Sequence, residues 1–195
     1  MKKGLTELVF ILDKSGSMSG LESDTVGGFN SMIEKQKRID GECFVTTVLF
    51  SDDSVIVHDR MPLCEMKPLT NDDYVPCGST ALLDAVGNTI HHIEQIHKYA
   101  RIDDVPEHTM FVITTDGMEN ASRKYSYNDI KRLVENKKKC GWEFVFFGAN
   151  IDTISTAESI GISRNKASSF VATSAGIAER DEEICDLICM LRGGK

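Results

Sequence analysis

A run of consecutive apolar residues near the start of the chain, at positions 8–12, places the strongest constraint on the fold. A short apolar run without alternation is typical of a strand that is buried on both faces of a parallel sheet. The run ends in Asp13, and hydroxyl side chains follow at Ser15 and Ser17. Because ligands of open α/β sheets bind at the carboxyl ends of the strands, we expect these side chains to lie at a binding edge.

Strand-like and helix-like segments alternate along the rest of the chain. Continuous apolar or β-branched segments predict strands, and apolar residues spaced by about one helical turn predict helices. Such alternation is typical of a mainly parallel sheet that is covered by helices on both faces. The expected strands are 5–12, 42–50, 55–60, 109–115, 142–147 and 167–171, and the expected helices are 20–38, 79–100, 126–139, 152–160 and 174–191.

The segment 55–60 differs from the other strands because it alternates apolar and polar residues directly after a turn-forming sequence. This pattern predicts a hairpin that ends in an antiparallel edge strand. The sequence contains no internal repeat and no linker. We therefore predict one α/β domain over residues 1–195, with a doubly wound, mainly parallel six-stranded sheet and one antiparallel edge strand.

Charge and hydropathy limit the classes of partner. The chain of 195 residues has a formal net charge of −8, which disfavours nucleic acid because phosphate recognition needs a basic surface. No apolar run approaches the roughly 20 residues that span a bilayer, so we expect no membrane partner. The first strand begins soon after Met1 without a signal-like segment, and the sequence therefore predicts a cytoplasmic protein.

Polar side chains in three loops at the expected carboxyl edge of the sheet predict one shared site. In a doubly wound sheet the strands that end near residues 12 and 115 are neighbours, so Asp13 and Asp116 would face each other across one crevice. Ser15 and Ser17 would lie beside them, and Thr80 would complete the set from the start of the helix 79–100. A set of oxygen ligands alone suits Mg²⁺, Mn²⁺ or Ca²⁺.

The same residues resemble the von Willebrand factor A (VWA) domain family. The resemblance depends on the motifs Asp-Lys-Ser-Gly-Ser-Met at 13–18, Gly-Ser-Thr-Ala-Leu-Leu-Asp-Ala at 78–85 and Thr-Thr-Asp-Gly-Met-Glu-Asn at 114–120. On these motifs the chain is identified as a stand-alone, intracellular, bacterial-type member of the family. The resemblance implies an intact metal-ion-dependent adhesion site, known as MIDAS.

In the family, these positions hold a divalent cation, here expected to be Mg²⁺ or Mn²⁺ in preference to Ca²⁺. By resemblance, the hydroxyls of Ser15, Ser17 and Thr80 would coordinate the metal, and Asp13 and Asp116 would act directly or through water. The last coordination position would accept an Asp or Glu side chain of a protein partner. The resemblance thus implies a metal-dependent protein-binding module that is not an enzyme.

An enzymatic alternative stays open at this point. A strand that ends in an aspartate beside Mg²⁺ also looks like a haloacid-dehalogenase-type phosphatase, with Asp13 as the nucleophile and Asp116 as a metal ligand. That family needs a second acid two residues after the nucleophile as the general acid. Ser15 occupies that position, and a serine hydroxyl does not hold a proton at a useful pKa.

The cysteines favour structural roles. Cys43 and Cys140 lie beside expected strands, and we predict that both are small core residues. Cys185 and Cys189 lie one helical turn apart, which favours two thiols flanking an apolar helix face over a metal or redox pair. In a cytosolic protein we expect them to be reduced.

Three other features have both a functional and a structural interpretation. The histidines at 91, 92 and 97 surround Glu94, but their spacing lacks the HExxH zinc pattern and favours a partly solvated helix face. The pair Gly27-Gly28 favours close packing or a bend over a phosphate loop. Asp84 either bonds back to a loop near the site or is a solvated helix residue.

Overall fold

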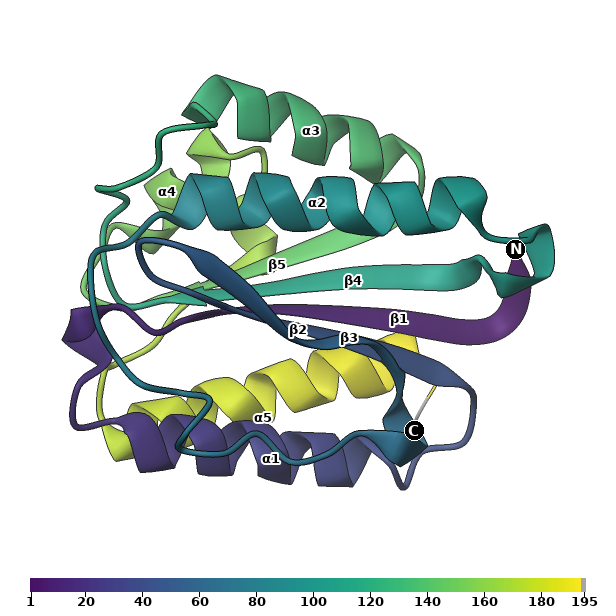
Figure 1. Ribbon diagram of the computed structural model, residues 1–195, viewed down its shortest axis with the longest axis horizontal. Helices are drawn as coiled ribbons and strands as arrows, with labels where there is room; N and C mark the ends of the chain where they lie inside the picture. Colours follow the sequence, from purple (N-terminus) through teal and green to yellow (C-terminus); the bar gives the residue numbers. More distant parts are fainter. Residues whose placement is uncertain (194–195) are drawn as a thin grey trace.

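The computed structural model describes residues 1–193, which form a six-stranded sheet between two layers of helices (Figure 1). The strand order is β3-β2-β1-β4-β5-β6. The strands are β1 (Lys2–Asp13), β2 (Cys43–Phe50), β3 (Ser54–Pro62), β4 (Pro106–Thr115), β5 (Trp142–Gly148) and β6 (Ala167–Ser169). The α-helices are α1 (Glu22–Gln36), α2 (Leu82–Tyr99), α3 (Tyr127–Lys139), α4 (Thr153–Ser159) and α5 (Ser174–Leu191).

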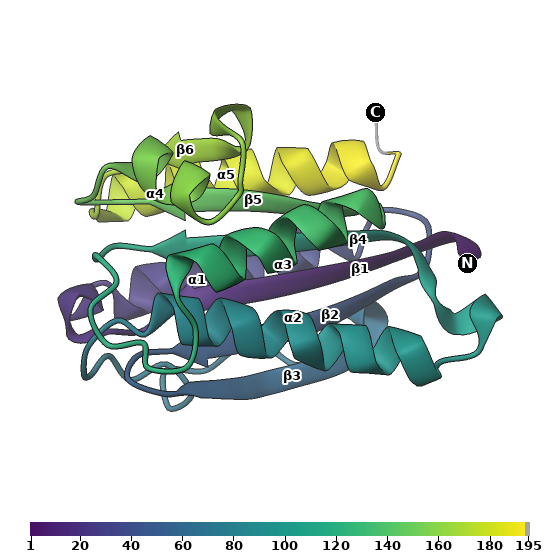
Figure 2. The same ribbon diagram turned by 90° about the horizontal axis from the view of Figure 1, so that it is seen from above.

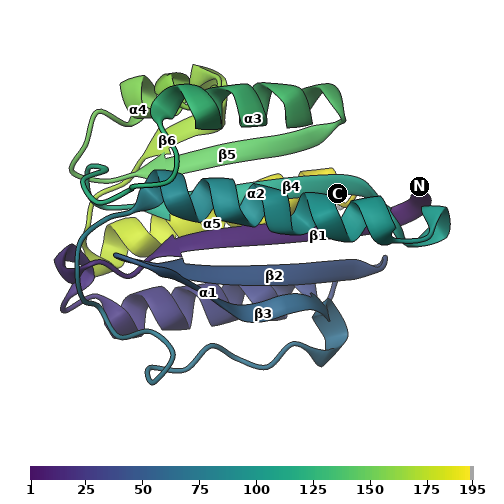
Figure 3. The ribbon, with the colours of Figure 1, turned by 45° about the horizontal axis from the view of Figure 1, so that its top comes forward.

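Only β3 runs antiparallel to its neighbour among the described strands, and it lies at one edge of the sheet (Figure 3). The other neighbouring strands pair in parallel. The predicted fold class, a doubly wound and mainly parallel sheet with one antiparallel edge strand, is therefore confirmed.

Polar caps explain where several helices begin. Ser126 and Asp129 form a capping box at the start of α3, in which each side chain accepts the backbone N–H of the other residue. The side chain of Thr173 accepts the Gly176 amide at the start of α5. None of the helices in residues 1–193 combines the length and the apolarity that a bilayer-spanning segment requires.

Each face of the sheet has its own hydrophobic core. Helices α1 and α5 cover one face, and α2, α3 and α4 cover the other (Figures 1 and 2). The inner side of α1 is formed by Val26, Phe29, Met32 and Ile33. Alternate residues of β1 enter the two cores, which explains why its sequence is apolar without interruption.

Gly28 allows α1 and α5 to approach closely. A Cβ atom at this position would lie 1.9 Å from Oδ2 of Asp181, which is buried on α5. At Gly27, no atom of the described residues lies within 4 Å of the corresponding position. The pair Gly27-Gly28 therefore serves close helix packing, and only the second glycine is needed for it.

A buried charged cluster lies near the edge of the sheet opposite the carboxyl ends of the parallel strands. Glu7 of β1 is fully buried, and its Oε1 accepts a hydrogen bond from Arg60 Nε at 2.9 Å. His97 of α2 bonds to the other carboxylate oxygen. His97 is partly buried, which agrees with the expected partly solvated helix face, and it contacts Glu7 because a buried carboxylate needs partners that replace its water.

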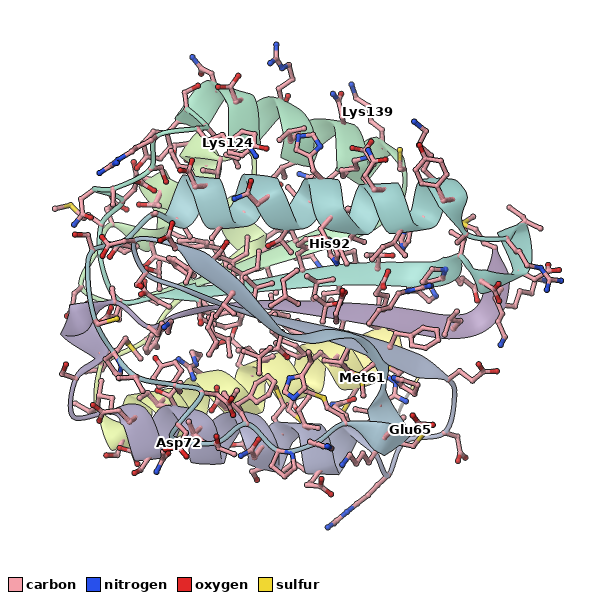
Figure 4. All side chains as sticks on the ribbon, viewed as in Figure 1. Met61, Glu65, Asp72, His92, Lys124 and Lys139 are labelled. Atoms are coloured by element: carbon pink, nitrogen blue, oxygen red, sulfur yellow. The ribbon has the colours of Figure 1, made fainter. Side chains whose placement is uncertain are left out.

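The remaining histidines of α2 also contact separate carboxylates, which excludes the shared zinc site. His91 bonds to Glu94, and His92, which is labelled in Figure 4, bonds to Asp59 on β3. Within residues 1–193, no three His, Cys, Asp or Glu side chains group in a way that could hold a metal ion.

The two cysteines that were predicted to be core residues differ. Cys43 is buried at the start of β2, as predicted, and burial raises the pKa of its thiol to about 12. Cys140 is exposed, so the prediction is wrong for this residue. It lies at the end of α3 just before Gly141, where the chain turns with a φ of +86° and β5 has not yet begun.

Candidate metal centre

The first loop of the candidate site begins where β1 ends. Asp13 is buried, and the Ser15 amide donates a hydrogen bond to its Oδ1 atom at 2.7 Å. This contact turns the chain directly after the strand, and a short 3₁₀ helix follows at Gly16–Met18. The turn places the hydroxyl oxygens of Ser15 and Ser17 3.1 Å apart.

Asp116 enters the site from the neighbouring strand. β1 pairs with β4 in parallel, with Leu12 opposite Thr114, so both strands end at the same edge. The hydroxyl of Ser17 donates to Asp116 Oδ1 at 2.6 Å. The other carboxylate oxygen of Asp116 is buried, and no hydrogen-bond partner contacts it among the described residues.

Thr80 lies in the loop before α2 and is held by the loop that follows β4. The Thr80 amide donates to Asn120 Oδ1 at 2.9 Å, and the Asn120 amide donates to the Thr80 carbonyl at 3.1 Å. A Cβ atom on Gly117 would lie 3.2 Å from Thr80 Oγ1 and 3.7 Å from Ser17 Oγ. The two hydroxyls therefore flank Gly117, where a larger residue would crowd them.

The structure thus brings together all five predicted residues, from three loops at one edge of the sheet: Asp13, Ser15, Ser17, Thr80 and Asp116. Four of them are buried, and Ser17 is exposed. The site is therefore reached from solvent on the side of Ser17.

Two residues that were given no role at the site from the sequence hold Asp13 in place. The hydroxyl of Thr115 donates to Asp13 Oδ2 at 2.5 Å, and the phenol of Tyr74 donates to the Asp13 carbonyl. Thr115 directly precedes Asp116 at the end of a strand, and this position in the sequence could have indicated that its hydroxyl lies at the site. Tyr74 lies in the long connection between β3 and α2, and no sequence pattern marks it.

Two acidic residues near the site serve the loops around it. Asp84 accepts hydrogen bonds from the backbone amides of residues 123–125, so the alternative in which it bonds to a loop is correct. Glu119 accepts from the Leu83 amide at the start of α2 and from Ser122. Both carboxylates are therefore occupied by internal donors.

The electrostatics of the site favour a cation. Burial raises the pKa of Asp13, while hydrogen bonds from Thr115 and Ser15 oppose this effect and the nearby Asp116 adds to it. Two buried carboxylates at one point disfavour each other's charge unless a cation lies between them.

The donor atoms also fit a hard divalent cation. The candidate ligands offer only oxygen atoms, and one of them, Asp116 Oδ2, is buried without a partner in the part of the chain that the structure describes. Buried polar atoms are normally bonded, so this oxygen indicates a missing partner. Mg²⁺ and Mn²⁺ prefer such carboxylate and hydroxyl oxygens.

Solved structures of low sequence identity share this architecture. Proximal thread matrix protein 1 from the mussel byssus matches with a TM-score of 0.67 and 17% identity, over 95% of this chain and 46% of that chain. The von Willebrand factor domain of the type V pili tip protein Mfa5 from Porphyromonas gingivalis matches with a TM-score of 0.65 and 11% identity, over 95% of each chain. The chain has the VWA fold.

Other comparisons define the limits of this likeness. A von Willebrand factor type A protein from Catenulispora acidiphila shares the VWA fold with a TM-score of 0.58 and 14% identity, over 92% of this chain and 41% of that chain. The chain thus spans less than half the length of that protein and of the thread matrix protein. No family model and no curated protein matches the sequence. One structure of the thread matrix protein is described as having a zinc-occupied MIDAS motif.

Proposed function

We propose that this chain is a protein-binding module that holds an acidic side chain of its partner through a divalent cation. Asp13, Ser15, Ser17, Thr80 and Asp116 would hold the cation. The observation that carries the proposal is the buried Asp116 Oδ2 atom, which lies beside converging hydroxyls and has no hydrogen-bond partner within residues 1–193. The VWA fold of the chain supports the proposal by analogy.

The ligand set suits a cation that stays available to a partner. Three of the five side chains are neutral hydroxyls, and Asp13 and Asp116 would act directly or through water. A cation with few directly bound carboxylates keeps positive charge, which attracts a further anionic oxygen. Mg²⁺ keeps waters where protein ligands are lacking, and a carboxylate of the partner can replace one of them. The metal would be Mg²⁺ or Mn²⁺.

Charge supports the need for a cation in this role. The chain carries a net charge of −8, and its surface would repel an acidic partner. A divalent cation at the sheet edge neutralises the two carboxylates of Asp13 and Asp116 and gives an acidic side chain a positively charged atom to contact. The resulting contact is a strong, charge-assisted one at the centre of an interface.

The proposed role is not catalytic. The phosphatase alternative needs a general acid two residues after Asp13, where Ser15 donates its amide to the Asp13 carboxylate instead. No observation favours that alternative further, and hydrolysis of p-nitrophenyl phosphate by the Mg²⁺-loaded protein would contradict a purely binding role. The cytoplasmic location stays a prediction of the sequence.

A calorimetric titration of Mg²⁺ and Mn²⁺ into the metal-free protein tests the metal site. The wild type is expected to bind one cation per chain, and Asp116→Asn is expected to lose this binding. Asp53→Asn is the matched control, because Asp53 is an exposed carboxylate beyond β2 on the same edge. Equal binding by wild type and Asp116→Asn would refute the site.

A second experiment tests the partner. Immobilised wild-type protein is expected to capture a protein in Mg²⁺ and to release it in EDTA, and Asp53→Asn is expected to behave in the same way. Thr80→Ala, which removes one hydroxyl ligand without adding charge, is expected to capture less. Capture that is insensitive to EDTA and to Thr80→Ala would show that binding does not use the metal.

A further inference from the structure

A cavity of about 310 Å³ lies at the end of the sheet opposite the candidate metal centre. It lies between the amino ends of β1 and β2, the segment that follows β3 and the loop that follows α1. Most of its lining is apolar: Leu5, Ile39, Cys43, Phe44, Pro62 and Leu63. Sites for small molecules are concave, of about 300–1,000 Å³, and are lined mainly by apolar side chains with a few polar groups. The cavity has the size and the lining of such a site.

Three charged side chains also line the cavity, and two of them are already neutralised. The Nζ atom of Lys37 lies 2.7 Å from Glu34 Oε1, and Oε2 of Glu42 lies 2.7 Å from Lys2 Nζ. The third charged side chain is Arg192, at the end of α5. The net charge of the cavity wall therefore depends on the partners of Arg192.

Arg192 is bound by uncharged oxygens alone within residues 1–193. Its guanidinium donates to the carbonyls of Gln36, Ile39 and Gly41 and to Gln36 Oε1, at 2.7–3.1 Å. These contacts fix the guanidinium but do not neutralise it, although a charge removed from water is normally paired. Its charge acts on the Cys43 thiol, where it opposes the rise in pKa that burial causes. The cavity thus combines an apolar wall with a positive charge.

Tertiary contacts hold the wall of the cavity in place. Gln36, which accepts from the guanidinium, is fully buried, and its Nε2 atom lies 3.4 Å from the sulfurs of both Cys185 and Cys189. The ring of Phe44 lies beside the guanidinium of Arg60, with 4.7 Å between the guanidinium carbon and the ring centroid. A ligand would therefore bind without first having to order the site.

We propose that this cavity binds a small monocarboxylate with an apolar tail, such as a medium-chain alkanoate. The tail would lie against the apolar wall, and the carboxylate would lie beside Arg192. Arginine has five N–H donors, and the hydrogen bonds of Arg192 within residues 1–193 use its two terminal nitrogens, so the Nε–H is left for the carboxylate. This site is separate from the metal centre at the carboxyl edge and does not depend on the proposed function.

Alkylation of Cys64 by iodoacetamide tests the location of the site. Cys64 is exposed and lines the cavity, so octanoate is expected to slow its modification, as followed by mass spectrometry. Cys77 and Cys140 are exposed outside the cavity, and we expect their rates to stay unchanged. Octylamine has the tail with the opposite charge, and acetate has the charge without the tail. Neither is expected to protect Cys64 at the same concentration.

Calorimetric titration of octanoate tests the role of the charge. EDTA is present throughout, so that the carboxylate cannot bind a cation at the metal centre. The wild type is expected to bind one octanoate per chain. Arg192→Gln is expected to bind about tenfold more weakly, because a charge-assisted contact is lost. Arg38→Gln makes the same change at an exposed arginine outside the cavity and is expected to bind like the wild type.

Two substitutions at Cys64 test the role of the cavity volume. Cys64→Trp places an indole ring in the cavity and is expected to abolish binding of octanoate. Cys64→Ser keeps the space and is expected to leave binding unchanged. Because Cys64 is exposed, neither change disturbs the hydrophobic core.

Thermal unfolding followed by circular dichroism establishes that each variant is folded. The proposal is wrong if octanoate protects Cys64 no better than octylamine does. It is also wrong if folded Arg192→Gln and Cys64→Trp proteins bind octanoate as tightly as the wild type.

Discussion

The phenol of Tyr74 donates a hydrogen bond to the backbone carbonyl of Asp13. Tyr74 is 1% exposed and lies in the connection between β3 and α2, the same connection that carries Thr80. Backbone contacts reinforce this link, because the Cys77 amide donates to the Lys14 carbonyl and the Gly16 amide donates to the Gly78 carbonyl. The loop with Thr80 and the loop with Asp13 are therefore one connected unit.

Tyr74→Phe is expected to lower the free energy of unfolding by about 1–3 kcal/mol, because a buried carbonyl loses its partner. Urea denaturation of the metal-free protein measures this effect. Tyr127→Phe is the matched control, since Tyr127 is exposed at the start of α3, and we expect a change below about 0.5 kcal/mol there. Equal effects at the two positions would show that the Tyr74 hydroxyl contributes nothing.

The adjacent glycines of α1 are expected to respond in opposite directions. Gly28→Ala places a methyl group against Asp181, which cannot move away because it is buried and bonded to Arg180. We therefore expect the free energy of unfolding to fall by about 1–3 kcal/mol. The added methyl group of Gly27→Ala meets open space in a helix, and we expect the free energy of unfolding to rise by about 0.5–1 kcal/mol. Thermal or urea unfolding of both variants checks the signs, and a loss at Gly27 would contradict this account.

Glu7→Gln is expected to lower the free energy of unfolding by about 3 kcal/mol, because the partly buried guanidinium of Arg60 loses its charged partner inside the protein. Glu42→Gln breaks an exposed ion pair with Lys2 and is expected to cost less than about 1 kcal/mol. The two variants differ in burial but not in the chemical change. Similar urea midpoints for both would mean that the buried cluster is not a net source of stability.

His58 is expected to make stability depend on pH. Burial lowers the pKa of this histidine on β3 below its ordinary value of 6.5, and its Nδ1 atom is buried without a partner among the described residues. The unfolded chain therefore binds a proton at a pH where the folded chain does not, and stability falls as the pH drops below about 6.5. His58→Leu is expected to flatten the fall of the unfolding free energy between about pH 7 and pH 5. Parallel profiles for wild type and variant would exclude His58 as the cause.

Much of the fold could be predicted because its signals are local. The apolar run at 8–12 and the apolar and β-branched segment at 109–115 identify strands that are buried on both faces, and the structure makes them the neighbours β1 and β4. The alternation at 55–60 identified the antiparallel edge strand in the same way. Periodicity of two residues or of one helical turn reports which faces are buried, and this information is present in a short segment of sequence.

The candidate site was predictable for a related reason. Asp13 and Asp116 directly follow buried strands, and the topology of a doubly wound sheet brings such positions to one edge. Their convergence therefore follows from the fold class. That the site holds a metal stays a prediction.

The sequence by itself determined the strands, the helices, the class of sheet and the residues at its carboxyl edge, because each depends on short-range patterns and on general rules of topology. Only the tertiary structure decided that Tyr74 supports Asp13, that Glu7 and His97 form a buried pair, and that Gln36 joins two thiols of α5. These contacts join residues far apart in the sequence. They depend on the path of a long loop and on how two helices pack, and neither leaves a periodic signal in the chain.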